Sequence, residues 1–300
     1  MILQLGLRAT ACGLLAFALC GPASASASDV HYVPTSMNVV DAILELGGVG
    51  PGDFLVDLGS GDGRISIRAA RRFGTRGFGV EIEPHLVQSA RDEARKQGVS
   101  DKVTFETRDL FGTDLGRATV ITAYLLPSLN LRLRPQLFEQ LKPGSRILTH
   151  DFDFGDWLPD RKLTVDVPDK PYGSPRSDIM LWVVPADFSG VWQWTAPGPA
   201  GGDVRYEAKI EQRFQVPSLL LISEGLRLAV SEARVRGNTL SFAVNGPAGL
   251  QRFSAELSGN TLSGQTVRGD APGVNWMATR IKAGKMDIGT GGITPVAVGN

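Results

Sequence analysis

The stretch from residue 54 to residue 64 constrains the fold more than any other part of the sequence. It starts with a short apolar run that is typical of a strand buried on both faces. Three glycines at alternating positions follow, Gly59, Gly61 and Gly63, and they allow a sharp turn and a close approach of the backbone to a ligand. Helical spacing resumes over residues 65–73. This order of strand, glycine turn and helix predicts the first unit of a nucleotide-binding α/β fold.

The charges around this turn discriminate between ligands. Asp57 ends the strand and Asp62 lies inside the turn. A dinucleotide such as NAD or FAD would place its pyrophosphate at the N-terminus of the following helix, where two carboxylates repel it. S-adenosylmethionine (SAM) carries an ammonium and a sulfonium, so the same acids favour it. The glycines are also spaced G-x-G-x-G and not G-x-G-x-x-G. The turn therefore predicts SAM over NAD, and a plain glycine turn of another α/β fold is the remaining alternative.

Composition sets the scale of the molecule. The chain has 300 residues, of which 42% are apolar and 21% charged, which is enough material for two hydrophobic cores. Its 31 basic and 31 acidic residues give a formal net charge of zero. This balance provides no electrostatic footprint for nucleic acid, so we expect no nucleic-acid partner.

The first residues have the pattern of a secretory signal peptide. Arg8 precedes an apolar run over residues 9–20, and small-x-small cleavage patterns follow at 23–25 and 25–27. The apolar run is too short to span a bilayer. We therefore expect residues 1–27 to be a signal peptide and the protein to be exported, periplasmic or secreted, or cytoplasmic if the signal does not function.

Cysteine and histidine positions exclude two kinds of site. Both cysteines fall inside the predicted signal peptide, so the mature chain would have no disulfide and no thiolate metal site. The three histidines, His31, His85 and His150, show no metal-ligand spacing. We expect no metal.

Strands and helices alternate after the glycine turn, which predicts a doubly wound α/β sheet. A helix over 37–46, capped by Thr35 or Ser36, precedes the first strand. Further strands are expected over 77–82, 103–106, 118–126 and 146–151, with helices over 84–98 and 129–141. Two strands with no helix between them, 162–167 and 178–184, then predict that the sheet ends in an antiparallel hairpin.

Polar residues at the ends of these elements are candidates for cofactor contacts. Glu81 ends the second strand, where an acid can accept hydrogen bonds from both ribose hydroxyls, and Glu83 competes for that role. Asp109 follows the third strand and is placed to bond an adenine amino group, or else is a solvated turn acid. Tyr32 and Thr35 could face the cofactor, or could only pack and cap.

Five segments carry a resemblance to a known family. They are Tyr32-Val-Pro-Thr35, Asp57 to Ile65, Gly79 to Pro84, Tyr124-Leu-Leu-Pro127 and Gly144 to Phe152. They resemble class I SAM-dependent methyltransferases with a seven-stranded Rossmann-like sheet. The branch is similar to the one that contains the ATP-synthase c-subunit lysine methyltransferases and to the non-SET nucleosomal lysine methyltransferases. The resemblance covers residues 30–186.

This resemblance implies roles for particular residues. Asp57, Gly59 and Gly61 would lie at the methionine end of SAM, Glu81 on the ribose and Asp109 near the adenine. The cofactor site as a whole would consist of Tyr32, Thr35, Asp57, Gly59, Ser60, Gly61, Gly63, Glu81 and Asp109. Tyr124 would stand beside the transferred methyl group.

The expected activity is SAM-dependent methylation of a protein lysine, with Tyr124, His150 and Asp151 as catalytic candidates. An acceptor lysine must lose a proton despite a free pKa of about 10.4, and burial in an apolar cleft lowers that pKa. His150 is equally interpreted as a residue that only bonds within the sheet rim. A small-molecule methyltransferase is one alternative. Because SAM is made in the cytoplasm, an exported binding protein with a non-catalytic methyltransferase-like domain is another.

Residues 187–282 predict a second domain, an antiparallel barrel or sandwich. Residues 204–214 alternate between apolar and charged side chains, and the string Gly-Asn-Thr-Leu-Ser recurs at 237–241 and 259–263, which suits hairpin turns. Gly190-Val-Trp192 at the start, with Trp276 and Arg280 at the end, is similar to the closure of lipocalin-like barrels. We expect Trp192, Trp194 and Trp276 in the core, a possible envelope partner for this domain, and a disordered tail over 283–300.

Overall fold

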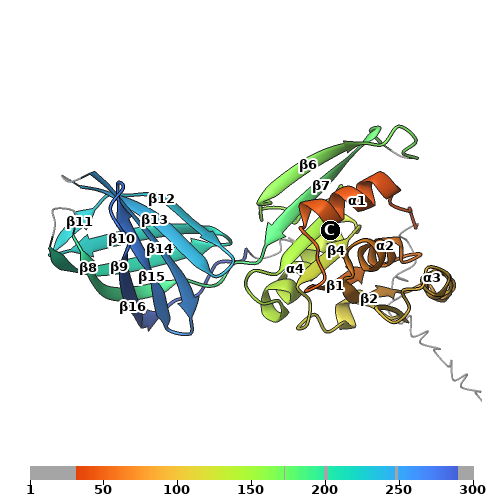
Figure 1. Cartoon of the computed structure of the whole chain (residues 1–300), viewed down its shortest axis with the longest axis horizontal. Coiled ribbons are helices and arrows are strands. Elements are labelled where there is room, and N and C mark those ends of the chain that lie inside the picture. The colour runs from red at the N-terminus through yellow and green to blue at the C-terminus, as the bar shows by residue number, and fades with distance from the viewer. Residues whose placement is uncertain (1–31, 172, 199–201, 247–248, 290–300) are drawn as a thin grey trace, which may run out of the picture. The chain divides into compact units, whose positions relative to one another are not determined.

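A computed structural model describes residues 32–171, 173–198, 202–246 and 249–289. These residues form a mixed seven-stranded sheet with helices and a nine-stranded antiparallel sheet (Figure 1). The predicted fold class is therefore confirmed. The predicted signal peptide, residues 1–27, lies outside the described residues. None of the helices in the described ranges is long and apolar enough to cross a membrane.

The seven strands of the first sheet have the order β3-β2-β1-β4-β5-β7-β6. Their bounds are β1 Phe54–Leu58, β2 Arg76–Glu81, β3 Val103–Thr107, β4 Val120–Ala123, β5 Arg146–His150, β6 Arg161–Asp166 and β7 Arg176–Val183. Strands β1 to β5 are parallel, whereas β7 pairs antiparallel with both β5 and β6. The predicted terminal hairpin is therefore present, and the carboxyl ends of β1, β2, β4 and β5 share one edge.

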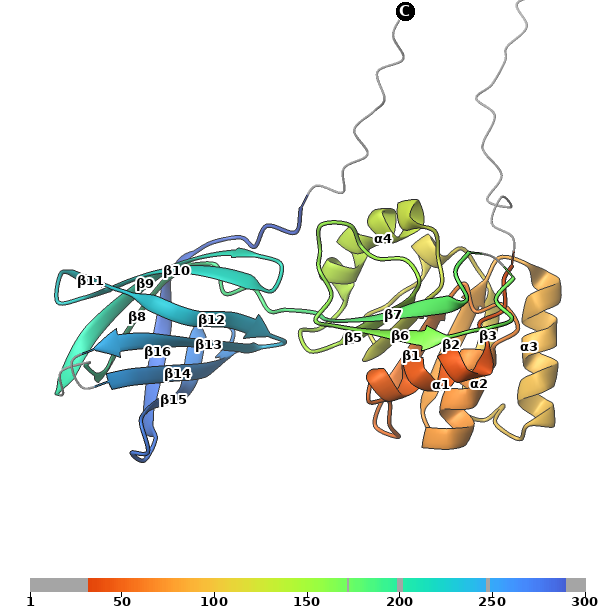
Figure 2. The ribbon, with the colours of Figure 1, turned by 90° about the horizontal axis from the view of Figure 1, so that it is seen from above.

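Helices cover both faces of this sheet (Figure 2). Their bounds are α1 Met37–Leu46, α2 Arg64–Phe73, α3 Pro84–Lys96 and α4 Pro127–Gln140. Leu55 of β1 packs in a cluster with α1 and α2, and the next residue, Val56, packs in a cluster with α4. Successive side chains of a strand point to opposite faces, so both faces of β1 are buried and its apolar run is explained.

Strand β4 is shorter than the predicted 118–126. It ends at Ala123, because Tyr124 leaves the sheet and Pro127 starts α4. Proline suits the first turn of a helix, where its missing N–H has no partner to lose. The segment between β4 and α4 therefore lies outside the sheet, and Tyr124 is its first residue.

The second sheet has the order β11-β10-β9-β8-β16-β15-β14-β13-β12. Its strands are β8 Gly190–Pro197, β9 Asp203–Arg213, β10 Val216–Ser223, β11 Leu226–Leu228, β12 Val230–Arg236, β13 Thr239–Gly246, β14 Gly249–Ser258, β15 Thr261–Arg268 and β16 Val274–Ala283. The β12–β13 and β14–β15 hairpins turn at the two Gly-Asn pairs, as predicted. Val235 N–H donates to the carbonyl of Gln215 at 3.3 Å, which brings β12 to the start of β10 and nearly closes the sheet.

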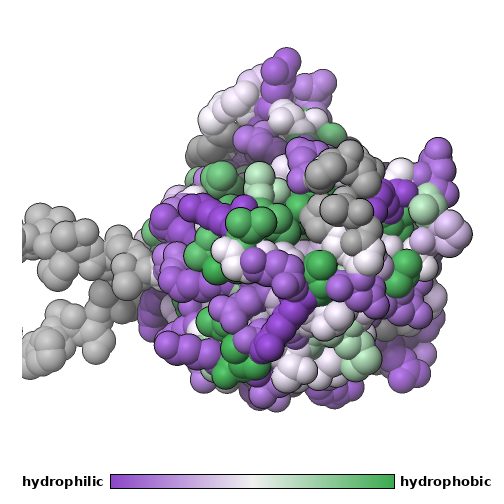
Figure 3. Space-filling view, turned by 90° about the vertical axis from the view of Figure 1, so that its left-hand side faces the viewer, coloured by the Kyte–Doolittle hydropathy of each residue, from purple (hydrophilic) through white to green (hydrophobic). Residues whose placement is uncertain are grey.

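The three tryptophans of this sheet lie in its core. Trp192, Trp194 and Trp276 are at most 5% exposed, as expected of core side chains. The Arg280 guanidinium lies 4.5 Å from the centroid of the Trp192 ring and donates to the carbonyl of Asp187 at 2.7 Å. On the face shown in Figure 3, hydrophobic side chains are scattered among hydrophilic ones and form no continuous patch over the described residues.

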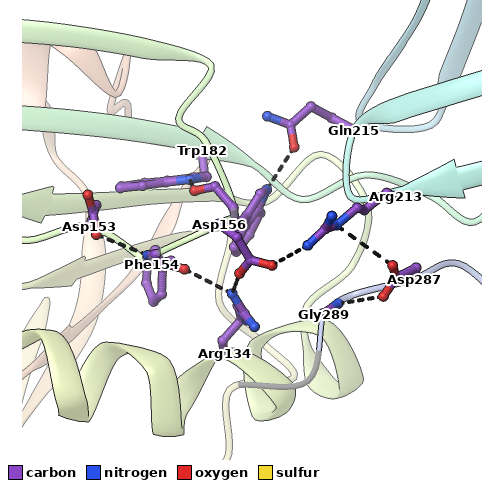
Figure 4. Close-up of polar contacts among 11 residues, drawn as sticks. Arg134, Asp153, Phe154, Asp156, Trp182, Arg213, Gln215, Asp287 and Gly289 are labelled. Carbon is purple, nitrogen blue, oxygen red and sulfur yellow. Dashed lines mark hydrogen bonds and ion pairs between the residues drawn. The ribbon is translucent and has the colours of Figure 1, made fainter. Parts of the chain in front are cut away.

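The turn between β9 and β10 inserts a phenylalanine into the core of the first sheet. Phe214 is 4% exposed, belongs to the cluster of α4 and stacks on Trp157 with ring centroids 5.9 Å apart. Its φ of 51° lies in the left-handed region, which costs a side chain about 1–2 kcal/mol. Neighbouring residues make polar contacts: Trp157 donates to Gln215 at 2.8 Å, and Figure 4 shows Asp156, which accepts from both Arg213 and Arg134.

The expectation of a disordered tail from residue 283 is wrong for residues 283–289. Asp287 N–H donates to the carbonyl of Gln212 at 2.8 Å, and its carbonyl accepts from Phe214 N–H at 3.0 Å. Ile288 packs against the same cluster as Phe214. The glycine-rich composition of the tail gave no sign of these contacts, because the hydrogen-bond partners are backbone groups of β9 and of the turn after it. Residues 290–300 lie outside the described residues.

Replacement of Phe214 by alanine is expected to lower the free energy of unfolding of the full chain by about 3–5 kcal/mol, because it removes a buried ring. Urea denaturation measures this change. Glu224→Ala is the matched control, since Glu224 also has a positive φ, 49°, but is exposed at the β10–β11 turn. A Phe214 variant no less stable than the control would contradict the insertion.

Candidate functional site

The glycine turn has the conformation that its sequence predicted. Gly59, Gly61 and Gly63 have φ values of 74°, 52° and 77°, all in the left-handed region. The N–H groups of Gly59 and Ser60 donate to the carbonyl of Val80 at 3.0 and 2.9 Å, which fixes the turn to the end of β2. A Cβ on Gly63 would lie 2.5 Å from the Phe105 ring, so this position also requires the absence of a side chain.

Asp57 is the buried acid of the site. It is 2% exposed at the end of β1, and its Oδ1 accepts a hydrogen bond from the Thr122 hydroxyl at 2.6 Å. Its Oδ2 is buried and has no hydrogen-bond partner among the described residues. Burial raises the pKa of the Asp57 carboxyl to about 7, against the opposing effect of the Thr122 hydrogen bond. A buried carboxylate oxygen without a partner favours a cationic ligand.

Asp62 corrects part of the electrostatic argument. Its carboxylate is paired with Arg64, with Arg64 Nη2 at 2.5 Å and Arg64 Nε at 2.9 Å. Arg64 Nη1 also donates to the carbonyl of Thr35 at 2.7 Å. The charge of Asp62 is therefore largely balanced within the turn, and Asp57 is the acid that distinguishes a cation from a phosphate.

Glu81 faces the glycine turn. Its Oε2 accepts from Gly61 N–H at 3.0 Å, and its Oε1 accepts from the N–H groups of Ile82 and Glu83. Glu83 sits outside the turn as the N-cap residue of α3, and its carboxylate lies 3.7 Å from His85. This arrangement favours Glu81 over Glu83 for the predicted ribose contact.

The other cofactor candidates have mixed placements. Asp109 is exposed and caps a 3₁₀ helix by accepting from Phe111 N–H at 2.9 Å, which is its turn role. The Ser60 hydroxyl is buried beside the glycine turn, with no partner in the described part of the chain. Tyr32 is 43% exposed. The predicted cofactor contacts of these three residues stay predictions.

The three catalytic candidates lie together at the carboxyl ends of β4 and β5. The Tyr124 ring packs against the His150 ring, tilted by 32° with centroids 3.9 Å apart, and the Tyr124 hydroxyl donates to Asp151 Oδ2 at 3.3 Å. Burial and the neighbouring Asp151 carboxylate raise the pKa of Tyr124 to about 12. The hydroxyl therefore stays protonated at neutral pH and acts as a hydrogen-bond donor.

His150 is held on both sides. Its Nδ1 lies 3.1 Å from the Thr35 hydroxyl and its Nε2 lies 2.8 Å from the Ser177 hydroxyl. Burial lowers the pKa of His150 to about 4, although Asp151 acts in the opposite direction. The imidazole is therefore neutral at pH 7 with both nitrogens engaged. This geometry suits a positioning residue and not a proton acceptor.

Neither Thr35 nor Ser36 caps α1 with its side chain, although the sequence predicted that one of them would. Ser36 occupies the N-cap position of α1, but its side chain makes no capping hydrogen bond. Thr35 is 5% exposed and its hydroxyl bonds His150 across the chain. The segment before α1 therefore contacts the β5 side of the site through Thr35.

Sequence reasoning missed several residues of the site. Thr122, Arg64, Ser177 and Lys170 each bond a predicted residue, and Asn130 donates to the carbonyls of Phe152 and Asp153. Thr122 could have been found, because β4 lies beside β1 in this topology. Lys170 lies in a loop without periodicity and gave no signal. No group of three or more metal-ligating side chains occurs in the described ranges.

Strand order, glycine turn and acids together define a class of protein. A parallel sheet in the order 3-2-1-4-5 that ends in an antiparallel hairpin, with acids at the ends of β1 and β2, is that of a class I SAM-dependent methyltransferase. Residues 57–161 match a family described as the ANTKMT methyltransferase domain. A protein-lysine N-methyltransferase of Saccharolobus islandicus is 38% identical over 52% of this chain and 94% of its own length. The chain therefore belongs to this methyltransferase family.

Other relatives match over less of their length. The lysine N-methyltransferase of the ATP synthase c-subunit from Xenopus laevis is 33% identical over 43% of this chain and 56% of its own, so the chain spans about half of that relative. A crystal structure described as an RNA methyltransferase from Salinibacter ruber with S-adenosyl-L-homocysteine is 52% identical, covering 52% of this chain and 96% of that chain, with a TM-score of 0.47.

SAM is the methyl donor of this family, and the residues present fit it. The buried Oδ2 of Asp57 has no partner among the described residues and suits a cationic donor, and Gly59, two residues later in the turn, is exposed. Glu81 offers a carboxylate at the same turn. These residues would hold the donor, which supplies an activated methyl group when bound.

Alanine at position 63 is expected to lower the free energy of unfolding by about 2–4 kcal/mol, because strain at positive φ adds to the clash with Phe105. Gly98→Ala is the control. Gly98 has a φ of 67° but nothing within 4 Å of an added Cβ, so we expect only about 1 kcal/mol there. Equal losses in urea denaturation would show that Gly63 is not closely packed.

Asp57→Asn is expected to stabilise the chain more at pH 8 than at pH 5. The folded-state pKa of Asp57 is raised from 3.8 to about 7, so its stability contribution is full below pH 3.8 and is lost as the pH rises through about 7. Asparagine does not titrate, so the variant should gain about 2–3 kcal/mol relative to wild type between these two pH values. Urea denaturation at both pH values checks this, and a constant difference would contradict the raised pKa.

Proposed function

We propose that this protein transfers the methyl group of SAM to the side-chain amine of a lysine in a protein. The observation that carries the proposal is the match to the Saccharolobus islandicus protein-lysine N-methyltransferase over 94% of that protein's length. The acceptor side of the site supports it. Tyr124 and Asp151 offer an aromatic ring and a carboxylate, which together suit an alkylammonium group.

The two side chains best placed to remove a proton are unsuited to do so at neutral pH. Tyr124 keeps its proton because its pKa is about 12, and His150 has a pKa of about 4 with both ring nitrogens bonded. With these two excluded, we propose that the acceptor amine loses its proton to water, helped by burial, which lowers the pKa of an amine. The protein contributes alignment, which can be worth about 7–11 kcal/mol of the barrier.

Residues 1–27 have the signal-peptide pattern, so we propose export. A fusion of residues 1–30 to a reporter that is active only in the periplasm is expected to give signal. If the reporter stays in the cytoplasm, export is contradicted and the protein works where SAM is made.

Labelled SAM tests the activity. The full chain is incubated with methyl-labelled SAM and an extract of the source cells, and the label is followed through protease and ribonuclease digestion. We expect label in protein, recovered as methyl-lysine after acid hydrolysis. Label that is released by ribonuclease, or that stays in small molecules, would contradict a protein acceptor.

Tyr124→Phe separates binding from transfer. The variant keeps the ring on His150 but loses the hydrogen bond to Asp151, so methyl transfer is expected to fall by about tenfold or more. Calorimetric affinity for SAM is expected to stay within about twofold of wild type, because Tyr124 lies outside the glycine turn. A large loss of SAM affinity with unchanged turnover would contradict the assignment of Tyr124 to the acceptor side.

A further inference from the structure

Asp151 is the point at which the contacts of the acceptor side converge. Its Oδ2 accepts from the Tyr124 hydroxyl at 3.3 Å and from Lys170 Nζ at 2.6 Å, and its Oδ1 accepts from Asp178 N–H at 3.0 Å. Its φ is 63°, an unfavourable left-handed conformation for a residue with a side chain. Three hydrogen bonds thus hold the carboxylate between Tyr124, Lys170 and the backbone of Asp178.

Lys170 reaches this carboxylate from the connection between β6 and β7. Its side chain is 14% exposed, and Nζ also donates to the carbonyl of Arg176 at 2.7 Å. Nζ and the Tyr124 hydroxyl share Asp151 Oδ2, so the ammonium lies within two hydrogen bonds of the residue predicted to stand beside the methyl group.

Lys162 shows what an ordinary surface pair looks like in the same hairpin. Its Nζ lies 2.7 Å from Asp178 Oδ2, and its side chain is 52% exposed. Among the described lysines, Lys170 is the one with an ion pair to a catalytic candidate. Exposed ion pairs such as that of Lys162 contribute little stability. The Lys170 side chain differs because it is mostly buried against Asp151.

We propose that Asp151 and Tyr124 form the ammonium-binding end of the acceptor-lysine site, and that Lys170 is an internal lysine in that place and is itself methylated. The inference rests on the proposed methyl transfer to lysine. It adds a modification site within the chain, and it means that an acceptor lysine from another protein competes with Lys170 for Asp151.

The step balances without any further reactant. The Lys170 ammonium releases a proton to water, and the lone pair of the neutral Nζ forms the new N–C bond as the S–C bond of SAM breaks. The sulfonium takes the electron pair of that bond and leaves as the neutral thioether, S-adenosylhomocysteine. A cationic donor nearby favours the loss of the ammonium proton, because like charges disfavour the charged form.

Mass spectrometry of the full chain tests the proposal. After incubation with SAM alone, a protease that cleaves before aspartate releases residues 169–177, whose single lysine is Lys170, and residues 160–165, whose single lysine is Lys162. We expect the first peptide to gain the mass of one to three methyl groups at a rate independent of protein concentration. The second peptide should stay unchanged.

Two variants and one cofactor-free measurement complete the test. Lys170→Arg keeps the charge beside Asp151 and is expected to abolish the modification while it leaves the affinity for SAM unchanged. Asp151→Asn is expected to slow the modification by about tenfold or more. Without SAM, an acetylating reagent should modify Lys170 more slowly than Lys162 in the wild type, and the difference should narrow in Asp151→Asn.

Three outcomes would overturn the inference, and they are distinguishable. If SAM binds and other proteins are methylated while residues 169–177 stay unmodified, the self-methylation fails and the proposed function stands. If Lys170 is acetylated as fast as Lys162, the buried ion pair is absent. If SAM does not bind at all in calorimetry, both the inference and the proposed function fail.

Discussion

A single buried carboxylate sets the chemistry of this site. Asp57 is the penultimate residue of a strand whose two faces are both covered. One of its carboxylate oxygens is bonded to Thr122 and the other has no partner in the described part of the chain. An ionised carboxylate in this position is costly unless a positive charge arrives, and burial accordingly raises its pKa to about 7. The glycine turn, in which Gly59, Gly61 and Gly63 all have positive φ, bends the chain directly after this strand. The fold thus keeps an acid whose natural partner is a ligand.

The proposed acceptor side differs from the surroundings of Asp57. Here the polar groups satisfy one another: Thr35 and Ser177 bond the two nitrogens of His150, and Asp151 accepts from Tyr124 and Lys170. Tyr124 and His150 keep fixed protonation states near neutral pH, so these side chains supply shape and orientation. The aromatic rings of Tyr124 and His150 and the Asp151 carboxylate can orient an acceptor. The nucleophile is then the nitrogen of the acceptor amine itself, as in methyl transfer to an amine.

Local signals predicted most of the fold and part of the site. The glycine turn, the alternation of strands with helices and the period-two strands of the second sheet each follow from short-range patterns. The position of Glu81 at the end of β2 followed from the distance between two strand ends, and its ribose contact stays a prediction. Pairings between distant segments did not. Arg64 neutralises Asp62 and Thr35 bonds His150, and neither contact has a signature in residue spacing.

Phe214 and Lys170 illustrate the same limit. A phenylalanine at a hairpin turn reads as a member of its own sheet, yet its ring packs with Trp157 in the other core. A lysine in a loop reads as solvated, yet it is mostly buried on Asp151. In both cases tertiary contacts decide the environment of the side chain, and no single-sequence pattern records them.

The central claim, that a cationic donor binds against the Asp57 carboxylate, is tested most directly by the protons exchanged when SAM binds. Calorimetry near pH 7 in buffers of different ionisation enthalpy measures that number for wild type and for Asp57→Asn. In the protein without ligand, the pKa of Asp57 is about 7, and a bound cation lowers this pKa. On binding SAM, wild type should therefore release about half a proton more than the variant. Equal proton exchange in the two proteins, or tighter binding of NADH than of SAM, would contradict the account.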